Sequence, residues 1–118
     1  MTEAQARRFA RTREAHRTEL AEDYVETILE LTREEGEACL TRIAARLGVA
    51  HPTVSKALRR LASEGLVVVR PYRPVILTSA GQRLAEQCRR RHARVVAFLV
   101  ALGVDRESAE SDAEGIEH

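Results

Sequence analysis

The chain has 118 residues, 44% of them apolar, with a net charge of +1, which suits one domain or a small domain with an appended arm. No apolar run approaches the about 20 residues that span a bilayer, and the Arg-rich N-terminus lacks the apolar stretch of a secretory signal. Cys39 and Cys88 lie too far apart for a Cys-x-x-Cys site, so we expect a cytoplasmic protein with two reduced thiols.

The first elements are a basic extension and a long helix. Residues 1–17 carry no apolar period and are interpreted as a mobile or helical N-terminal extension. From Thr18 the sequence predicts an amphipathic helix, and Gly36 is the expected terminator. The inner face of this helix comprises Leu20, Tyr24, Ile28 and Leu31.

The next segment predicts a helix-turn-helix. Thr41 is expected to cap a short helix through its hydroxyl, and Gly48 fits the tight turn that follows. A second helix has Pro52 in its first turn, where a missing N–H costs nothing, and Gly65 ends it.

A hairpin and two further helices complete the predicted order. The apolar runs 66–69 and 75–77 are typical of short strands, joined by residues 70–74 as a wing. Thr78 is expected to cap a long helix that ends near residue 102, and a last helix follows Asp105. We predict a mainly α fold, with a winged helix-turn-helix domain over residues 18–88 and a helical segment over residues 89–118.

Charge is strongly segregated along the chain. Residues 1–13 carry +3, residues 14–37 carry −7, residues 42–94 carry +10 and residues 105–118 carry −5. A basic middle segment with a helix-turn-helix predicts DNA binding, because the first residues of a recognition helix enter the major groove. The candidate DNA contacts are His51, Pro52, Thr53, Ser55, Lys56, Arg59, Arg60, Arg70, Tyr72 and Arg73.

The acidic segments contain candidate metal ligands. On a helix, Glu114, Glu117 and His118 have i, i+3, i+4 spacing and share one face. Asp23 and Glu26 form an i, i+3 pair in the first long helix, while His92 lies on an apolar stripe of the later one. Each feature alone also suits an ordinary solvated acidic face, a packed core histidine or a soluble helix end. A single site would explain all of them together.

These motifs lead to a resemblance. The chain resembles the MntR-type manganese transport regulators, within the diphtheria-toxin-repressor-like group of metal-dependent transcription factors. The similarity covers roughly four fifths of the chain. It rests on the motifs at 23–26, 54–61, 77–81 and 114–118, together with His92.

The resemblance implies a ligand set and a metal. It implies one or two Mn(II) ions per subunit, held by Asp23, Glu26, His92, Glu114, Glu117 and His118. Iron-type relatives carry a Cys at the place of Glu114, and hard carboxylate oxygens favour Mn(II) over softer ions. The chain ends inside the last motif, so the dimerisation segment 89–118 is expected to be truncated. The resemblance also implies that residues 1–17 are an addition that relatives largely lack.

The resemblance also implies a function. We expect a homodimeric, manganese-responsive repressor of manganese uptake genes that binds a palindromic operator, with metal as corepressor and no enzymatic activity. The apolar run 95–102 exceeds what one subunit's core needs, which favours an interface. The alternatives are a winged-helix factor that responds to iron or to a non-metal ligand, and a binuclear metallohydrolase.

Overall fold

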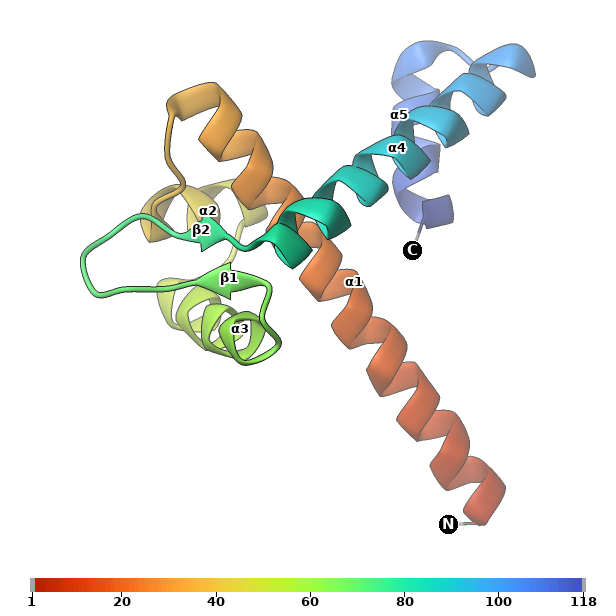
Figure 1. Ribbon diagram of the computed structural model, residues 1–118. Coiled ribbons are helices and arrows are strands. Elements are labelled where there is room, and N and C mark those ends of the chain that lie inside the picture. The colour runs from red at the N-terminus through yellow and green to blue at the C-terminus, as the bar shows by residue number, and fades with distance from the viewer. Residues whose placement is uncertain (1, 118) are drawn as a thin grey trace.

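The computed structural model describes residues 2–117, with Gly115 and Glu117 described by their backbone alone. The described elements follow the predicted order, as Figure 1 shows. They are α1 (Glu3–Glu35), α2 (Leu40–Leu47), α3 (His51–Ser63), β1 (Val67–Val68), β2 (Ile76–Leu77), α4 (Ser79–Ala101) and α5 (Arg106–Glu117). The mainly α, winged helix-turn-helix prediction is confirmed.

Helix α1 begins at Glu3, fifteen residues before the predicted start at Thr18. A capping box explains the early start, since the Thr2 side chain accepts from the Gln5 backbone N–H while the Gln5 side chain accepts from the Thr2 backbone. The extension is also rich in Ala and Arg, which are strong helix formers. At the other end Gly36 adopts a left-handed conformation with φ of 87°, as predicted.

The helix-turn-helix comprises α2 and α3. The prediction that Thr41 caps α2 is wrong, because α2 begins at Leu40 with Cys39 in the cap position and no side-chain cap. The backbone carbonyl of Cys39 instead accepts from the N–H of Ile43 at 3.0 Å. Gly48 takes φ of 68° at the turn, and Pro52 lies in the first turn of α3, both as predicted.

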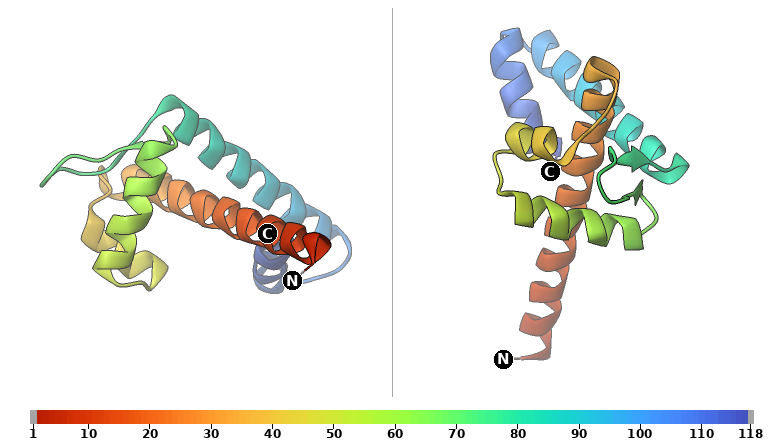
Figure 2. Two further views of the ribbon diagram at one scale, coloured as in Figure 1. Left: turned by 90° about the horizontal axis from the view of Figure 1, so that it is seen from below. Right: turned by 90° about the vertical axis from the view of Figure 1, so that its left-hand side faces the viewer.

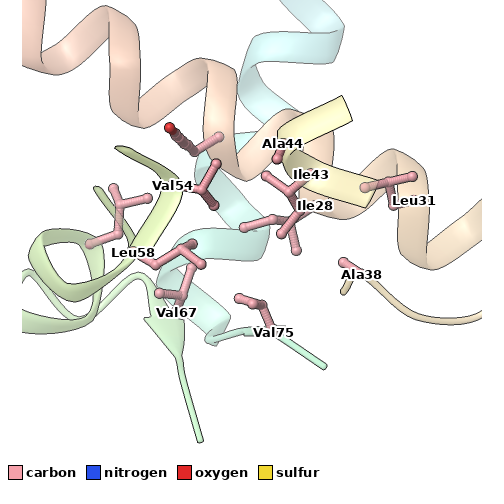
Figure 3. Close-up of a cluster of buried hydrophobic side chains, with 11 residues drawn as sticks. Ile28, Leu31, Ala38, Ile43, Ala44, Val54, Leu58, Val67 and Val75 are labelled. Carbon is pink, nitrogen blue, oxygen red and sulfur yellow. The ribbon is translucent and has the colours of Figure 1, made fainter. Parts of the chain in front are cut away.

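A single hydrophobic cluster joins α1 to the helix-turn-helix and the wing, as Figure 3 shows. Burying each large aliphatic side chain contributes about 1.5–3 kcal/mol, so this cluster supplies most of the stability of the DNA-reading unit. Its larger members are Tyr24, Ile28 and Leu31 of α1, Ile43 of α2, Val54, Leu58 and Leu61 of α3, and Val67 and Val75 of the wing.

The wing is pinned to the start of α4. Strands β1 and β2 are antiparallel, with Val67 opposite Leu77. The backbone N–H of Thr78 donates to the carbonyl of Leu66 at 3.0 Å, and its side chain caps α4 by accepting from the Gly81 N–H at 3.1 Å. Only glycine fits at position 81, because a Cβ there would overlap the Leu66 carbonyl oxygen.

Helices α4 and α5 form a hairpin with its own small cluster of Val96, Ala109 and Ala113. This hairpin and the N-terminal half of α1 project from the helix-turn-helix body in different directions, as Figures 1 and 2 show. The radius of gyration is therefore 16.1 Å, against about 13–14 Å for a compact domain of this length. Within the described residues, no helix has both the length and the apolar character to cross a membrane.

Candidate metal centre and nucleic-acid interface

Helices α1 and α4 are tied together by a partly buried charge network. A nitrogen of the Arg91 guanidinium lies 3.0 Å from a carboxylate oxygen of Glu22, and the same nitrogen donates to the Cys88 sulfur at 3.3 Å. The Glu22 side chain is only 10% exposed. Burial, followed by the charge of Glu22, raises the pKa of the Cys88 thiol to about 11. The network therefore fixes how the two helices lie at this level.

Next to this network, α4 meets α5 through two of the predicted ligands. His92 Nδ1 lies 3.6 Å from Glu114 Oε1, so an imidazole and a carboxylate from different helices face one another. His92 is mostly covered, with 27% of its side chain exposed, whereas Glu114 is 62% exposed. The inward placement of His92 that the apolar stripe predicts is thus observed.

Glu30 of α1 belongs to the same neighbourhood, although it is not among the ligands that the sequence predicts. Burial is the main cause that raises its pKa. The charge of Glu114 raises that pKa further and the charge of His92 lowers it, so Glu30 lies within electrostatic range of both. Its spacing could have indicated this, because Glu30 follows Glu26 by four residues on the same helical face.

The two predicted ligands on α1 lie one and two turns before Glu30. Asp23 and Glu26 are half-buried, and the charge of Glu26 contributes to the raised pKa of Cys88 on α4. The side chain of Glu117 and the whole of His118 lie outside the described residues. Among the residues that the structure does describe, no three His, Cys, Asp or Glu side chains form a group able to hold a metal ion.

The predicted DNA contacts lie mainly on one exposed surface. In α3, Ser55 is half-buried, while the other candidates, His51, Pro52, Thr53, Lys56, Arg59 and Arg60, are exposed. Arg60 is oriented by an ion pair with Glu64 at 3.3 Å. The α3 face that is turned away from Val54 and Leu58 is therefore free of core packing and available to a partner.

Two arginines of the basic segment are bound within the fold. The Arg42 guanidinium makes two hydrogen bonds of 3.1 Å to the Glu35 carboxylate. These hydrogen bonds are the main cause that lowers the pKa of Glu35, and the positive charges of Arg42 and Arg46 lower it further, against a smaller opposing effect of desolvation. Arg46 lies 3.5 Å from Glu30 and 3.0 Å from Glu34. These pairs attach α2 to α1, so part of the basic charge serves the fold rather than a polyanion.

The wing presents a fully exposed aromatic residue. Tyr72 at the tip has φ of 59°, a left-handed conformation that is uncommon for a bulky side chain, and it is 107% exposed. Arg70 and Arg73 flank it, and the N–H of Arg73 donates to the Arg70 carbonyl at 3.2 Å to close the turn. A strained, exposed aromatic between two cations is suited to contact a polyanion rather than to stabilise the fold.

A winged helix-turn-helix joined to a helical hairpin with imidazole and carboxylate groups defines the class of DNA-binding regulators with a metal-binding helical segment. Residues 16–75 match the model of the iron-dependent repressor N-terminal DNA-binding domain, and residues 78–118 match that of the iron-dependent repressor metal-binding and dimerisation domain. The chain belongs to the iron-dependent repressor family, and it is an MntR-type member.

Two curated relatives support this membership. The chain is 54% identical over 110 residues to the transcriptional regulator MntR of Escherichia coli O157:H7, a match that covers 93% of this chain and 71% of that protein. The match therefore includes at least part of residues 1–17, so the expectation that relatives largely lack this extension is wrong for this relative. The chain is 37% identical over 97 residues to the HTH-type transcriptional regulator MntR of Bacillus subtilis (strain 168), covering 82% and 68%. These relatives are transcription regulators, not enzymes, so the metallohydrolase alternative is dropped.

Solved structures agree with the fold. A manganese-dependent transcriptional repressor in complex with manganese superimposes with a TM-score of 0.73 at 34% sequence identity. The match covers 83% of this chain but 45% of the other one, so the chain spans less than half of that solved protein.

Proposed function

We propose that this chain is a manganese-responsive repressor of manganese uptake genes, with Mn(II) as corepressor. The observation that supports this most directly is the 3.6 Å approach of His92 Nδ1 to Glu114 Oε1, beside an acidic face of α1. The identity to MntR proteins and the likeness to a manganese-dependent repressor support the same metal.

The proposed ligands come from α1, from α4 and from the C-terminal segment of the chain. They are Asp23 and Glu26 on α1, His92 on α4, and Glu114, Glu117 and His118 at the end of the chain. Carboxylate oxygens with imidazole nitrogens suit a hard divalent ion such as Mn(II), and Glu114 supplies an oxygen where a thiolate would favour softer metals. The set is large enough for one or two ions per subunit.

The proposed switch acts on the orientation of α1 relative to the α4–α5 hairpin. A bound divalent ion supplies positive charge that offsets repulsion among the carboxylates. Asp23 and Glu26 would then be held against His92 and Glu114, while the Glu22–Arg91 pair at 3.0 Å limits sliding of α1 along α4. Because the α1 core cluster includes α3, fixing α1 also fixes the recognition helix. The population of domain arrangements would thereby shift when these residues hold the ion.

The functional unit that we propose is a homodimer on a palindromic operator in the cytoplasm. Each subunit presents one α3 helix to one half-site, with half-sites separated by about one helical turn of DNA or a multiple of it. The family description of residues 78–118 as a dimerisation domain supports the dimer.

DNA selected from a random-sequence pool in the presence of Mn(II) tests the proposal. We expect the selected duplexes to contain inverted repeats, and their affinity to fall at least tenfold when a chelator removes the metal. Fluorescence anisotropy measures both affinities. Equal affinity in manganese and in chelator would contradict a metal-dependent switch.

The alternative is a regulator that responds to iron or to a non-metal ligand. The family description names iron, which is the observation in its favour. Repeating the affinity measurement with Fe(II) under anaerobic conditions separates the two metals. Tighter DNA binding with Fe(II) than with Mn(II) at equal free concentrations would favour the alternative.

A further inference from the structure

The N-terminal part of α1 is a bare helix. Every residue from 2 to 18 is exposed, and Figures 1 and 2 show this segment leaving the body with nothing packed against it. We call residues 2–17 the arm. Fifteen helical residues extend about 22 Å, and a helix of that length is only marginally stable without a partner. All sides of this helical arm are therefore accessible to a binding partner.

The arm is strongly basic. It contains five arginines and two glutamates, which gives 5 − 2 = +3. Arg7 and Arg17 pair with Glu3 and Glu14 at 3.7 and 3.5 Å, both on the exposed surface, where such pairs are weak and easily exchanged. The remaining arginines, Arg8, Arg11 and Arg13, make no ion pair with the described residues. Such a surface is complementary to a row of phosphates.

The base of the arm adjoins the recognition helix. Arg17 and Tyr24 of α1 line one groove together with Thr53, Lys56 and Arg60 of α3. Arg13 lies one turn before Arg17 on the same helical face, so the basic surface continues from this groove along the arm. The groove therefore connects the arm to the surface that carries the candidate DNA contacts.

We propose that the arm is a second DNA-binding element, which runs beside the phosphate backbone next to the site occupied by α3. Arg13 and Arg17 extend the surface of α3, while Arg8 and Arg11 lie on another side of the helix and reach further phosphates. This inference rests on the proposed DNA-binding function. Backbone contacts of this kind strengthen binding to any sequence and do not select an operator.

Two triple variants with the same net charge test the arm. The arm variant is Arg8→Gln, Arg11→Gln and Arg13→Gln. The control is Arg89→Gln, Arg90→Gln and Arg106→Gln, which removes three exposed arginines from α4 and α5. Each triple lowers the formal charge from +1 to 1 − 3 = −2, so a general charge effect would be equal in both. Fluorescence anisotropy with a mixed-sequence 40-base-pair duplex, as a function of salt, measures binding with Mn(II) present.

We expect the arm variant to bind at least tenfold more weakly at low salt. Its plot of log affinity against log salt should be shallower by about 0.9 for each phosphate that a chain no longer neutralises. The control should retain the wild-type slope. Circular dichroism and thermal unfolding should show both variants folded, because no substituted side chain lies in the core.

Three results would overturn the inference. Equal slopes for the arm variant and the wild type would show that the arm does not touch phosphate. Equal weakening in both triples would show an effect of net charge alone. A shifted monomer–dimer equilibrium in the arm variant, with an unchanged slope, would assign the arm to the partner subunit. If the wild type itself bound no duplex, the proposed function would fail first, which is a distinguishable outcome.

Discussion

His92 is the residue whose substitution best separates a metal ligand from an ordinary packed histidine. For His92→Ala we expect the unfolding free energy without metal to fall by no more than about 1 kcal/mol, since the side chain is 27% exposed and its facing Glu114 is on the surface. The stabilisation by Mn(II) should largely disappear. In the wild type that stabilisation is about 2.7 kcal/mol at a hundredfold excess over Kd.

Thermal unfolding with and without Mn(II) measures both quantities. His16→Ala is the matched control, because His16 is exposed on the arm, about 10 Å along α1 before Asp23. The control should keep the full metal response. Unfolding of the His92 variant in the absence of metal, with its response to Mn(II) retained, would show that His92 is a core residue.

For single residues, the sequence predicts which side chains face the site better than it predicts the contacts that those side chains make. The inward placement of His92 follows from the apolar stripe around it, whereas its facing Glu114 is expected only from the family resemblance. The pair of Glu22 with Arg91 could not be predicted, because it joins positions 69 residues apart in the sequence, and spacing along one helix carries no information about such contacts. Arg42 and Arg46 belong to the basic segment that predicts DNA binding, yet they pair with α1 acids.

Gly81 is the position where the first turn of α4 packs directly against the backbone that leads into β1. A methyl group there would overlap the Leu66 carbonyl oxygen, which accepts from the Thr78 N–H. We expect Gly81→Ala to lower the unfolding free energy by about 2–3 kcal/mol, although Gly to Ala within a helix normally stabilises by up to about 1 kcal/mol. Urea denaturation measures this change.

Gly36→Ala is the matched control for Gly81→Ala. Gly36 ends α1 with φ of 87°, but a Cβ there meets nothing within 4 Å. Its cost should be the backbone strain alone, about 1 kcal/mol, and Gly36→Asn should recover part of it because Asn tolerates this conformation. A destabilisation by Gly81→Ala no larger than that by Gly36→Ala would contradict the steric argument.

Element order could be predicted almost entirely from turn and cap residues, whereas two boundaries could not. Gly48, Pro52 and Thr78 have strong local preferences, so the helix-turn-helix and the start of α4 lie where expected. The start of α1 could not be predicted from apolar periodicity, because the arm has no apolar face. The helix begins instead at a capping box that Thr2 and Gln5 form. Thr41 is not the cap of α2 because Cys39 holds that position without a side-chain bond.

For the whole molecule, the exposed apolar side chains of the hairpin predict how two copies meet. Phe98, Leu102 and Ile116 are 62%, 65% and 60% exposed, next to the small α4–α5 cluster. We expect Phe98→Asp to weaken dimerisation at least tenfold, because a charge would then be buried in the interface. Sedimentation equilibrium with Mn(II) present measures the dissociation constant.

The other phenylalanine of the chain supplies the control. Phe9 is 55% exposed on the arm, so Phe9→Asp makes the same chemical change on a comparable surface away from the hairpin. It should leave the dimer intact. Equal weakening by both substitutions, or none by either, would contradict an interface formed by α4 and α5.

The continuity of α1 has a mechanical consequence. One unbroken helix of 33 residues carries the arm, part of the DNA-reading core and the acidic face near His92. Its first residue lies about 30 Å from Asp23, so a tilt of about 10° near Asp23 displaces the tip by about 5 Å. That exceeds the 3.4 Å axial spacing of successive phosphates on one strand. The helix thus acts as a lever, and such a rotation would carry the arginines nearest the tip, Arg7 and Arg8, by about 4 Å, past one nucleotide.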